Sequence, residues 1–414
     1  MSQKNIFAAI DVGTTKTVAV LATVKDNYTM RVLGVGVSAT RGVQKGIVVN
    51  IDEAKVAIKE AVRKAEHSSG MKIESAYVGV TGRHVNSLNN RSAVAISRSD
   101  KLVAHDDLDR VMSAAKSIEV AGDRQLLHVI PRQFILDGNV GVKNPIGLHG
   151  FRLDVDAHII TAAATAVQNV VKCIRAINIE VVDLVLEPLA SAEACLRADE
   201  KDAGVILADI GGGTTDISVF KDGSIWHTSV LPVGGYQVTR DIAIGLGIPF
   251  NVAEELKKKH ANLNYRTIKE NEGIENTGLG IGDGQTILRN DMDEIIRARI
   301  EEIIRLIPME LPPSDYSSLI PAGLVLTGGS SNIPGIEILA QEILNMPVRV
   351  GAPTGMAGLS DILYDPAYST VVGLLLWGVN HSKDETKQPR PFARTRTAVI
   401  ARKVLSPIRR LLNK

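Results

Sequence analysis

Apolar and polar positions along the chain repeat one pattern twice. Residues 7–21 and residues 205–220 each contain an apolar run, an aspartate, a turn of Gly and Thr residues, and a second apolar run. Two apolar runs joined by such a turn predict a β-hairpin. The two aspartates, Asp11 and Asp209, are 198 residues apart. We interpret the repeat as two related α/β halves that face each other across a cleft.

Helix and strand patterns alternate after the first hairpin. Residues 75–81 predict a strand, and residues 159–185 predict a strand, a helix and a strand. Residues 52–67 predict a helix whose apolar positions recur with the helical period. These positions lie on one face and are Ala54, Ile58, Ala61 and Ala65.

Residues 86–158 interrupt this alternation. They contain polar strands, one helix near residues 105–118, and a loop rich in Gly, Asn and Pro at residues 137–150. We interpret them as an inserted subdomain. Residues 250–320 of the second half are mostly helical in pattern, with a polar segment rich in Gly and Asn at residues 271–290.

Composition is that of a globular protein long enough for more than one domain, with 414 residues of which 45% are hydrophobic and 22% charged. Two cysteines, Cys173 and Cys195, are too few for a disulfide framework or a cysteine-based zinc site. Both lie in apolar helical patterns, and we expect them to be small core residues. The N-terminus has no signal-peptide pattern, because Asp11 interrupts its apolar run. No segment reaches the roughly 20 apolar residues of a membrane-spanning helix, so we expect a cytosolic protein.

The formal net charge of +1 hides an asymmetry. Residues 380–414 hold ten Lys and Arg against two Asp and Glu, so this segment carries +8 and residues 1–379 carry −7. Nucleic acid is a poor partner for an acidic body, and aromatic residues that could stack on bases make up only 4% of the chain. The basic segment therefore needs a different explanation.

The C-terminal segment has two parts. Residues 381–397 have the composition of a flexible linker. On a helix, residues 398–414 place apolar side chains on one arc and five cations on the opposite arc. Burying a cation in a bilayer costs about 2.5–3.5 kcal/mol, so we expect this helix to lie in the interface of an anionic membrane rather than span it. The predicted membrane residues are Ile400, Arg402, Lys403, Val404, Leu405, Ile408, Arg409, Arg410, Leu411 and Leu412.

Two alternatives remain for the tail. Pro407 removes a helical hydrogen bond and is predicted to kink the helix, so residues 398–406 and 407–414 could form two short segments. A helix that docks on the body of the protein is the other explanation. The preceding linker and the absence of acidic residues in the last 18 positions weigh against docking.

The two hairpin turns carry candidate chemistry. Turns of Gly and Thr expose backbone N–H groups and small hydroxyls that approach phosphate oxygens without obstruction. An aspartate at the preceding strand end can hold Mg²⁺, usually through water. A plain glycine-rich hairpin is the alternative for either turn alone. It explains poorly why both turns follow an Asp at the same offset.

Two further segments are weaker candidates. Gly328 and Gly329, in a strand–turn–helix pattern at residues 323–335, could pack against a base or sugar, although such turns are common in α/β folds. Glu254, Lys257 and Lys258 place one acidic and two basic groups on adjacent helical turns, where a solvated charged face is the alternative.

Together these segments resemble the actin/Hsp70/sugar-kinase ATPase superfamily. Residues 10–20 and 207–220 are similar to its two phosphate motifs, and residues 325–336 to its adenosine motif. Residues 187–196 and 369–378 are similar to its two connecting helices. The resemblance implies an α/β, actin-like ATPase fold in which two RNase-H-like halves enclose a nucleotide cleft. It also implies ATP and Mg²⁺ as cofactors.

The resemblance assigns roles to individual residues. Asp11 and Asp209 would hold Mg²⁺, directly or through water. Glu187 would polarise the attacking water, with a favourable acid at a helix N-terminus as the alternative. The implied nucleotide-binding residues are Gly13, Thr14, Thr15, Lys16, Gly211, Gly212, Gly213, Thr214, Gly234, Gly235, Glu254, Lys257, Lys258, Gly328, Gly329 and Ser330.

The insert and the tail narrow the resemblance to the FtsA family of bacterial cell-division proteins. Ile-Pro-Arg-Gln-Phe at residues 130–134 and the sequence of residues 142–153 are similar to that family's inserted subdomain 1C. Residues 349–353, with Gly358 and Leu359 after them, also follow the family pattern. The resemblance extends over residues 5–380.

Membership would imply an ATP-binding polymer, with at most slow ATP hydrolysis. It would anchor filaments of the tubulin-like protein FtsZ to the cytoplasmic face of the inner membrane at the division septum, and recruit later division proteins. The FtsZ C-terminal peptide is expected on residues 250–320. Arg297, Arg299 and Arg305 could supply cations there, and a solvated charged face is again the alternative.

The implied subdomains follow the actin-like division. Subdomain 1A would comprise residues 1–85 and 159–196, 1C residues 86–158, 2A residues 197–245 and 320–380, and 2B residues 246–319. The connecting helix at residues 369–379 would pack toward 1A.

Other superfamily members fit less well. A related pilus-assembly protein would lack the amphipathic tail, and a rod-shape actin homologue would lack the insert. A chaperone would need a peptide-binding domain after residue 379, where only 35 residues follow. A catalytic sugar kinase is the remaining alternative.

Overall fold

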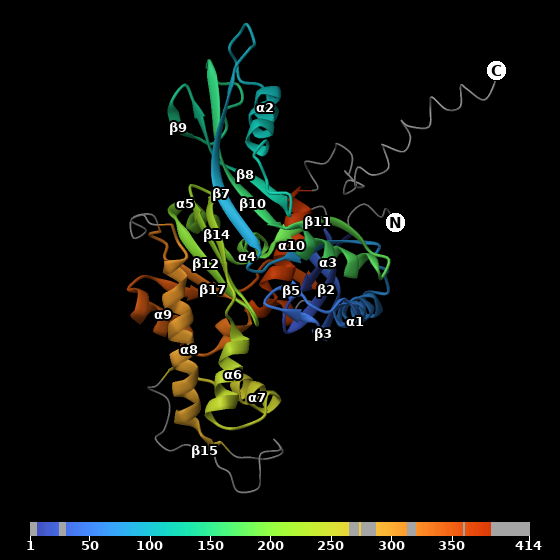
Figure 1. Cartoon of the computed structure of the whole chain (residues 1–414). Helices are drawn as coiled ribbons and strands as arrows, with labels where there is room; N and C mark the ends of the chain where they lie inside the picture. Colours follow the sequence, from blue (N-terminus) through green and yellow to red (C-terminus); the bar gives the residue numbers. More distant parts are fainter. Residues whose placement is uncertain are drawn as a thin grey trace, which may run out of the picture.

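The computed structural model describes residues 6–24, 30–264, 273–274, 287–312, 320–358 and 361–381 (Figure 1). The predicted amphipathic helix, with every predicted membrane residue, lies outside the described residues. So do linker residues 382–397 and most of the polar segment at residues 271–290. None of the helices in the described part of the chain combines the length and apolar character that crossing a membrane requires.

The first half is built on a six-stranded sheet with the order β11-β6-β1-β2-β3-β19. Its strands are β1 (Ile6–Val12), β2 (Lys16–Val24), β3 (Met30–Ala39), β6 (Ser75–Val80), β11 (Glu180–Leu186) and β19 (Met356–Gly358). A short ribbon, β4 (Val43–Gln44) and β5 (Ile47–Val48), precedes the first helix. The predicted first hairpin is confirmed, since β1 and β2 pair antiparallel with Asp11 opposite Val18.

Helices cover both faces of this sheet because successive strand residues point to opposite faces. Ala8 and Ile10 belong to the core shared with α1 (Ile51–Ser69) and α3 (Ala164–Arg175), whereas Ala9 faces the core of the connecting helices. The predicted apolar face of α1 is confirmed, because its four predicted residues are fully buried. The side chain of Asn50 caps the helix start by accepting hydrogen bonds from the backbone N–H groups of Asp52 and Glu53.

The second half repeats this plan with a five-stranded sheet of order β14-β13-β12-β17-β18. Its strands are β12 (Val205–Ile210), β13 (Thr215–Lys221), β14 (Ser224–Leu231), β17 (Leu324–Thr327) and β18 (Val348–Val350). Its helical elements are α5 (Ala198–Ala203), α6 (Gly235–Gly245), α7 (Phe250–His260), α8 (Arg289–Met309), the 3₁₀ turn η4 (Gly329–Asn332) and α9 (Ile336–Leu344), with the short pair β15 (Gly273–Ile274) and β16 (Ile287–Leu288). The second predicted hairpin, β12–β13, is also confirmed, and four residues separate its last paired positions, as in the first hairpin.

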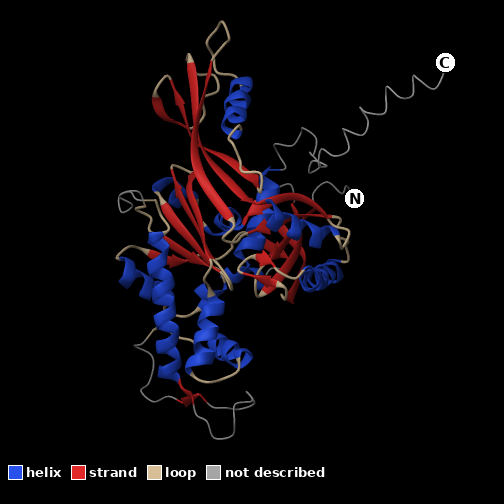
Figure 2. Ribbon diagram, in the orientation of Figure 1, coloured by secondary structure: helices blue, strands red, loops and turns tan. Residues whose placement is uncertain are grey.

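The inserted subdomain is confirmed as an α+β unit with its own sheet, ordered β7-β10-β8-β9. It contains β7 (Val85–Ala95), α2 (His105–Lys116), β8 (Arg124–Leu136), β9 (Asn139–Val142) and β10 (Arg152–Ala163). A small core of its own joins α2 to the sheet through residues such as Val111 and Val155. The insert projects from the molecule on the side opposite α6, α7 and α8 (Figures 1 and 2).

Two connecting helices, α4 (Glu187–Cys195) and α10 (Ser369–His381), cross between the halves. Their backbones touch at the crossing, where a Cβ atom on Gly373 would overlap the carbonyl oxygen of Ala190. Two 3₁₀ turns, η5 (Asp361–Tyr364) and η6 (Pro366–Tyr368), lead into α10. Both cysteines are buried and unpaired, as predicted.

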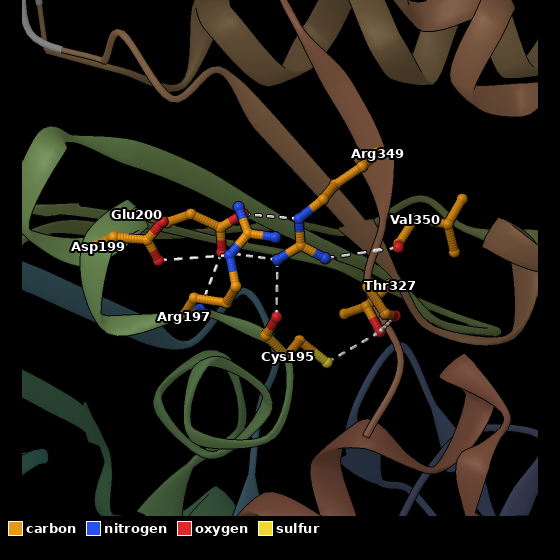
Figure 3. A network of polar contacts seen from close by, with 8 residues as sticks. Cys195, Arg197, Asp199, Glu200, Thr327, Arg349 and Val350 are labelled. Carbon is orange, nitrogen blue, oxygen red and sulfur yellow. Dashed lines mark hydrogen bonds and ion pairs between the residues drawn. The ribbon is translucent and has the colours of Figure 1, made fainter. Parts of the chain in front are cut away.

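A polar network fixes the end of α4 to the sheet of the second half (Figure 3). Arg349 of β18 binds both carboxylate oxygens of buried Glu200, at 2.7 and 2.6 Å, and donates to the carbonyl oxygen of Cys195 at 2.8 Å. The thiol of Cys195 donates to Ser369 Oγ at 3.0 Å, and Thr327 Oγ1 lies 2.7 Å from the same hydroxyl. The C-terminal end of α4 and the N-terminal end of α10 therefore meet beside Thr327 of the adenosine-like motif (residues 325–336).

The insert also contacts the second half directly, along the free edge of β14. Ser87 Oγ donates to the carbonyl oxygen of Thr228 at 2.9 Å, and Asn89 Nδ2 donates to that of Trp226 at 3.4 Å. Buried His158 lies between the Asn89 side chain, at 2.7 Å, and Thr228 Oγ1, at 3.0 Å. Alternate side chains of β7 thus pair with alternate backbone carbonyls of β14, which covers an edge strand without extending its sheet.

Candidate functional site

The two predicted metal aspartates lie at corresponding strand ends, Asp11 at the end of β1 and Asp209 at the end of β12. Each is only 7% exposed. Asp209 Oδ2 accepts hydrogen bonds from Ser191 Oγ of α4 at 2.6 Å and from Thr370 Oγ1 of α10 at 3.2 Å. Asp11 Oδ1 is buried and has no hydrogen-bond partner within the described ranges. Burial raises the pKa of Asp11 to about 7 and also raises the pKa of Asp209.

A third carboxyl group, Asp216 of β13, completes this set and was not predicted. It lies directly across the hairpin from Asp209. Its two oxygens accept hydrogen bonds from Thr81 of the first half and from Thr214, the latter at 3.0 Å. Burial raises the pKa of Asp216 to about 7. The sequence did hold a signal, because the first hairpin has Val18 where the second has an acid.

Glu187 begins α4 and is also buried. Burial, followed by the charges of Asp11, Asp216 and Asp209, raises its pKa well above the usual value. A small cavity beside it leaves about 10 Å³ open to the centre of a water molecule, and Thr81 and His84 also line this cavity. Four acidic side chains therefore influence one another in a poorly solvated region.

Lys16 supplies a cation to the same region. Burial lowers its pKa, while Asp11, Asp365 and Asp209 raise it. Its ammonium group lies 3.8 Å from the centre of the Tyr368 ring. Lys16 thus interacts electrostatically with these carboxyl groups and contacts an aromatic face.

The two predicted phosphate turns face each other closely. A Cβ atom on Gly212 would overlap the side chain of Thr15, and one on Gly213 would overlap the side chain of Thr14. Only glycine at these positions allows the turns of the two halves to approach so closely. Gly13 belongs to the same first turn, between β1 and β2.

The remaining predicted nucleotide residues adjoin the second turn. Gly235 N donates to the carbonyl oxygen of Gly211 at 2.9 Å, beside Gly234, and Ser330 Oγ lies 3.4 Å from the same oxygen. Lys257 donates to the carbonyl oxygen of Gly235 at 3.1 Å. The structure therefore brings these separate segments of the second half together.

Within each of the two weaker candidate segments, neighbouring residues differ in their surroundings. Lys257 and Lys258 pair with Glu254 at 2.7 and 3.1 Å, but the Lys257 side chain is 12% exposed whereas that of Lys258 is 69% exposed. Gly328, at φ +85°, lies against the Asp209 carboxylate, so its lack of a side chain serves that approach. Gly329 is more open, with Ala367 as its nearest neighbour.

These surroundings suit a hydrated cation. Within the described residues, no group of three His, Cys, Asp or Glu side chains is arranged to hold a metal ion directly. Asp11 Oδ1 still lacks a partner there, and the buried carboxyl groups gain stability from any added positive charge. Mg²⁺ usually keeps several of its waters and binds proteins through one or two carboxylates. The residues present therefore fit Mg²⁺ bound largely through water.

The three arginines predicted to bind a partner are engaged within the chain. Arg297 pairs with Glu301 at 2.9 Å, and Arg299 pairs with Asp241 at 2.5 Å and also with Glu302. Arg305 is 3.8 Å from Glu301, and its side chain is the most exposed of the three at 63%. An acidic peptide would have to exchange these pairs, most easily at Arg305.

Comparison with known proteins identifies the family. Residues 206–373 match the family model described as cell division protein FtsA, and residues 82–161 match the SHS2 domain inserted in FtsA. Cell division protein FtsA of Pseudomonas aeruginosa is 41% identical over 379 residues, covering 92% of this chain and 90% of that protein. Its counterpart in Bacillus subtilis is 36% identical over 383 residues, covering 92% and 86%. The chain belongs to the FtsA family.

FtsA membership settles the choice among superfamily members. The chain is therefore a cell-division protein with an actin-like fold, rather than a pilus-assembly protein, rod-shape protein, chaperone or sugar kinase. The SHS2 match coincides with the inserted sheet and its helix.

Solved structures support the fold alone. The type IV pilus biogenesis complex PilM–PilN gives a TM-score of 0.60 at 18% identity, covering 90% of this chain and 98% of that chain. MreB5 of Spiroplasma citri bound to ADP gives a TM-score of 0.53 at 14% identity, covering 94% and 100%. The actin-like fold expected from the sequence is confirmed.

Proposed function

We propose that this FtsA-family protein binds ATP with Mg²⁺ in the cleft between its halves. The observation that carries the proposal is the cluster of buried Asp11, Asp209, Asp216 and Glu187 beside two closely facing Gly/Thr turns. A cluster of buried acids is costly unless a cation balances its charge, and phosphate oxygens of a ligand commonly complete the coordination of such a cation. The solved MreB5 structure with ADP, which shares the fold, supports a nucleotide as that ligand.

Each group has a separate part in this proposal. Asp11 and Asp209 would hold Mg²⁺ through its waters, with Asp216 accepting hydrogen bonds from further waters. Backbone N–H groups of the turns at residues 13–16 and 212–214 would bind phosphate oxygens, and Gly234, Gly235 and Ser330 would support the second turn. Bound Mg²⁺ would neutralise charge on the terminal phosphates.

Any hydrolysis would depend on Glu187. Its carboxyl group lies next to a water-sized cavity, and burial together with the charges of the neighbouring acids raises its pKa, so a cation bound nearby would favour the ionised form. A protonated carboxyl group cannot accept a proton from water. We therefore expect slow turnover at most, since the base form depends on the bound metal.

Calorimetry with the full chain tests the nucleotide proposal. Asp209→Asn should weaken Mg-ATP binding by about tenfold or more, because it removes a charge that the bound ion needs. Asp52→Asn is the matched control, since Asp52 lies in the first turn of α1 with its side chain 88% exposed. Equal affinity for wild type and Asp209→Asn, or no effect of removing Mg²⁺ with EDTA, would contradict the assignment.

We further propose that the protein polymerises on the cytoplasmic face of the inner membrane at the septum. The charge asymmetry and the amphipathic pattern of residues 398–414 support a membrane anchor. Deleting residues 398–414 should abolish sedimentation with anionic liposomes. Replacing only Leu411 and Leu412 with Asn keeps every cation, so retained binding by that variant would show that charge alone suffices and would refute the amphipathic mechanism.

The proposed partner is the acidic C-terminal peptide of FtsZ, bound on α8 and its surroundings, with later division proteins recruited by the assembled polymer. Exposed Arg305 is the cation best placed for such a peptide. Arg305→Ala should weaken peptide binding in a fluorescence titration, more strongly at low salt. Arg63→Ala, at an exposed position of α1, is the control, and identical affinities for both variants would remove this surface from consideration.

A further inference from the structure

The 3₁₀ turn η6 joins two parts of the candidate site that are far apart in the sequence. Asp365 Oδ1 caps it by accepting a hydrogen bond from Ala367 N at 2.7 Å. The same oxygen accepts a hydrogen bond from Asn332 Nδ2 of η4 at 2.7 Å, and Gly328 N donates to the carbonyl oxygen of Pro366 at 3.2 Å. These bonds fix η6 against the adenosine-like motif.

The last residue of η6, Tyr368, reaches the phosphate side of the cleft. Its ring centre is 3.8 Å from the ammonium nitrogen of Lys16, at the start of β2 in the first half. A cation over an aromatic face is attracted by the ring quadrupole, and the attraction strengthens when both groups are poorly solvated. Lys16 is largely buried, so its amino group has few alternatives in water.

The alternatives that Lys16 does have are carboxylates. Asp11 and Asp209 attract it from within the acid cluster, and Asp365 attracts it from η6. If the ammonium group of Lys16 moved toward Asp11 or Asp209, it would neutralise a carboxylate that a bound cation needs. It would also move away from the turn proposed to bind phosphate. The aromatic ring holds the ammonium group without neutralising it, so the full charge remains available to an anionic ligand.

We propose that Tyr368 is a positioning residue that keeps Lys16 directed toward the terminal phosphates of a bound nucleotide. The proposal rests on the proposed nucleotide function and adds to it a determinant of selectivity for polyphosphates. Because η6 is bonded to η4, the position of Lys16 depends on the adenosine-like motif. Contacts on the base side of the cleft therefore influence the phosphate side through Asp365 and Tyr368.

Affinities for a series of ligands test this role. Tyr368→Leu should weaken binding of Mg-ATP by about three- to tenfold, the range expected for a partly buried cation–π contact. Adenosine, which carries no phosphate, should bind within about twofold of wild type, since the lost term involves only phosphate. Tyr368→Phe keeps the ring and should restore Mg-ATP affinity. A purely structural role would instead weaken both ligands equally.

A double-mutant cycle removes the remaining ambiguity. In a Lys16→Met background, Tyr368→Leu should have no further effect on Mg-ATP affinity, because the ring then has no cation to hold. Tyr364→Leu is the matched control, as Tyr364 lies four residues earlier and its hydroxyl donates to the carbonyl oxygen of Met356 at 2.8 Å. Additive effects of the Lys16 and Tyr368 substitutions would overturn the proposal.

A measurement without nucleotide separates the two proposals. With lysine labelled at Cε, the NMR signal of Lys16 should show an upfield ring-current shift in wild type and Tyr368→Phe, and lose it in Tyr368→Leu. Failure of wild type to bind Mg-ATP would refute the nucleotide function itself, and the positioning role with it. Normal binding with an unchanged Lys16 signal in Tyr368→Leu would refute only the positioning role.

Discussion

Thr81, the residue that follows the first-half strand β6, donates a hydrogen bond to Asp216 on the second-half strand β13. Both groups are buried, and the bond joins the halves at the base of the acid cluster. Asp216 lies opposite Asp209, so any change in its charge is felt by the predicted metal residues. A change in the charge of the acid cluster therefore also affects the hydrogen bond that joins the two halves.

This linkage predicts an unusual pH dependence. The pKa of Asp216 rises from 3.8 to about 7 on folding, so the folded state holds a proton that the unfolded state releases. Stability through this group is therefore present below about pH 4 and is lost as pH rises toward about 7, in the same direction as for Asp11, whose pKa is also raised to about 7. Buried His128 and His158, with pKa values lowered to about 4 and 3, act in the opposite direction.

Substitution isolates the contribution of Asp216 from that of the histidines. In the absence of metal and nucleotide, Asp216→Asn should gain free energy of unfolding relative to wild type as pH rises from 5 to 7.5, measured by urea denaturation at each pH. Asp52→Asn should track wild type throughout. A constant difference between Asp216→Asn and wild type over this range would show that Asp216 is ionised in the folded protein.

The crossing of the connecting helices predicts a large steric effect. Any side chain on Gly373 overlaps the backbone of Ala190, and neither helix can move away because both are packed in the same core. Gly373→Ala should reduce the free energy of unfolding by about 2–4 kcal/mol despite the better helix propensity of alanine. Gly122→Ala has open space around it and should change stability by less than about 1 kcal/mol in the same denaturation assay. A small effect at Gly373 would mean that the helices do not cross in contact.

Side chains of the insert, from Ser87, Asn89 and His158, form hydrogen bonds to strand β14. Loss of these bonds should loosen β14 locally rather than unfold the whole protein. His158 bridges Asn89 and Thr228, so His158→Ala removes one buried and one partly buried hydrogen bond and leaves the buried Thr228 hydroxyl less satisfied. Hydrogen exchange in β14 should become faster, while exchange in β1 stays unchanged. His105→Ala, on an exposed helix start, is the control. Uniformly faster exchange throughout the chain would indicate ordinary destabilisation and argue against a local role of the contacts between the insert and β14.

Local patterns predicted the local structure well. The repeat of Asp, Gly and Thr residues predicted both hairpins because turn chemistry and strand alternation depend on neighbouring residues. The same reasoning missed Asp216, although the comparison with Val18 of the first hairpin could have indicated it, because its hydrogen bond from Thr81 joins segments that are far apart in the sequence. It could not place β19 beside β3 either, because that pairing joins residues over 300 positions apart.

Charged residues were hardest to interpret from the sequence for a related reason. Arg297, Arg299 and Arg305 are spaced on one helix as candidates for a partner, yet their ion pairs include Asp241, from a different helix. Lys257 and Lys258 are neighbours in sequence, but packing buries one and exposes the other. Burial decides the role of a charge, and burial is set by the fold as a whole.

The bidentate pair of Arg349 and Glu200 leads to a prediction for the end of α4 (Figure 3). Burial alone would raise the pKa of Glu200, but its hydrogen bonds and ion pairs, chiefly with Arg349, lower it overall. Arg349→Met removes the bidentate partner of Glu200 and leaves its carboxylate with Arg197 alone, 3.0 Å away and largely exposed, so the free energy of unfolding at pH 7.5 should fall by about 1.5–3 kcal/mol. Because the folded pKa of Glu200 is lowered, the wild-type advantage is present above pH 4.5 and shrinks as pH falls below it.

The double variant Arg349→Met with Glu200→Gln should recover much of the loss, since it leaves no buried charge. If the double variant were as unstable as Arg349→Met alone, lost packing of the arginine rather than the weakened pairing of the carboxylate would account for the effect.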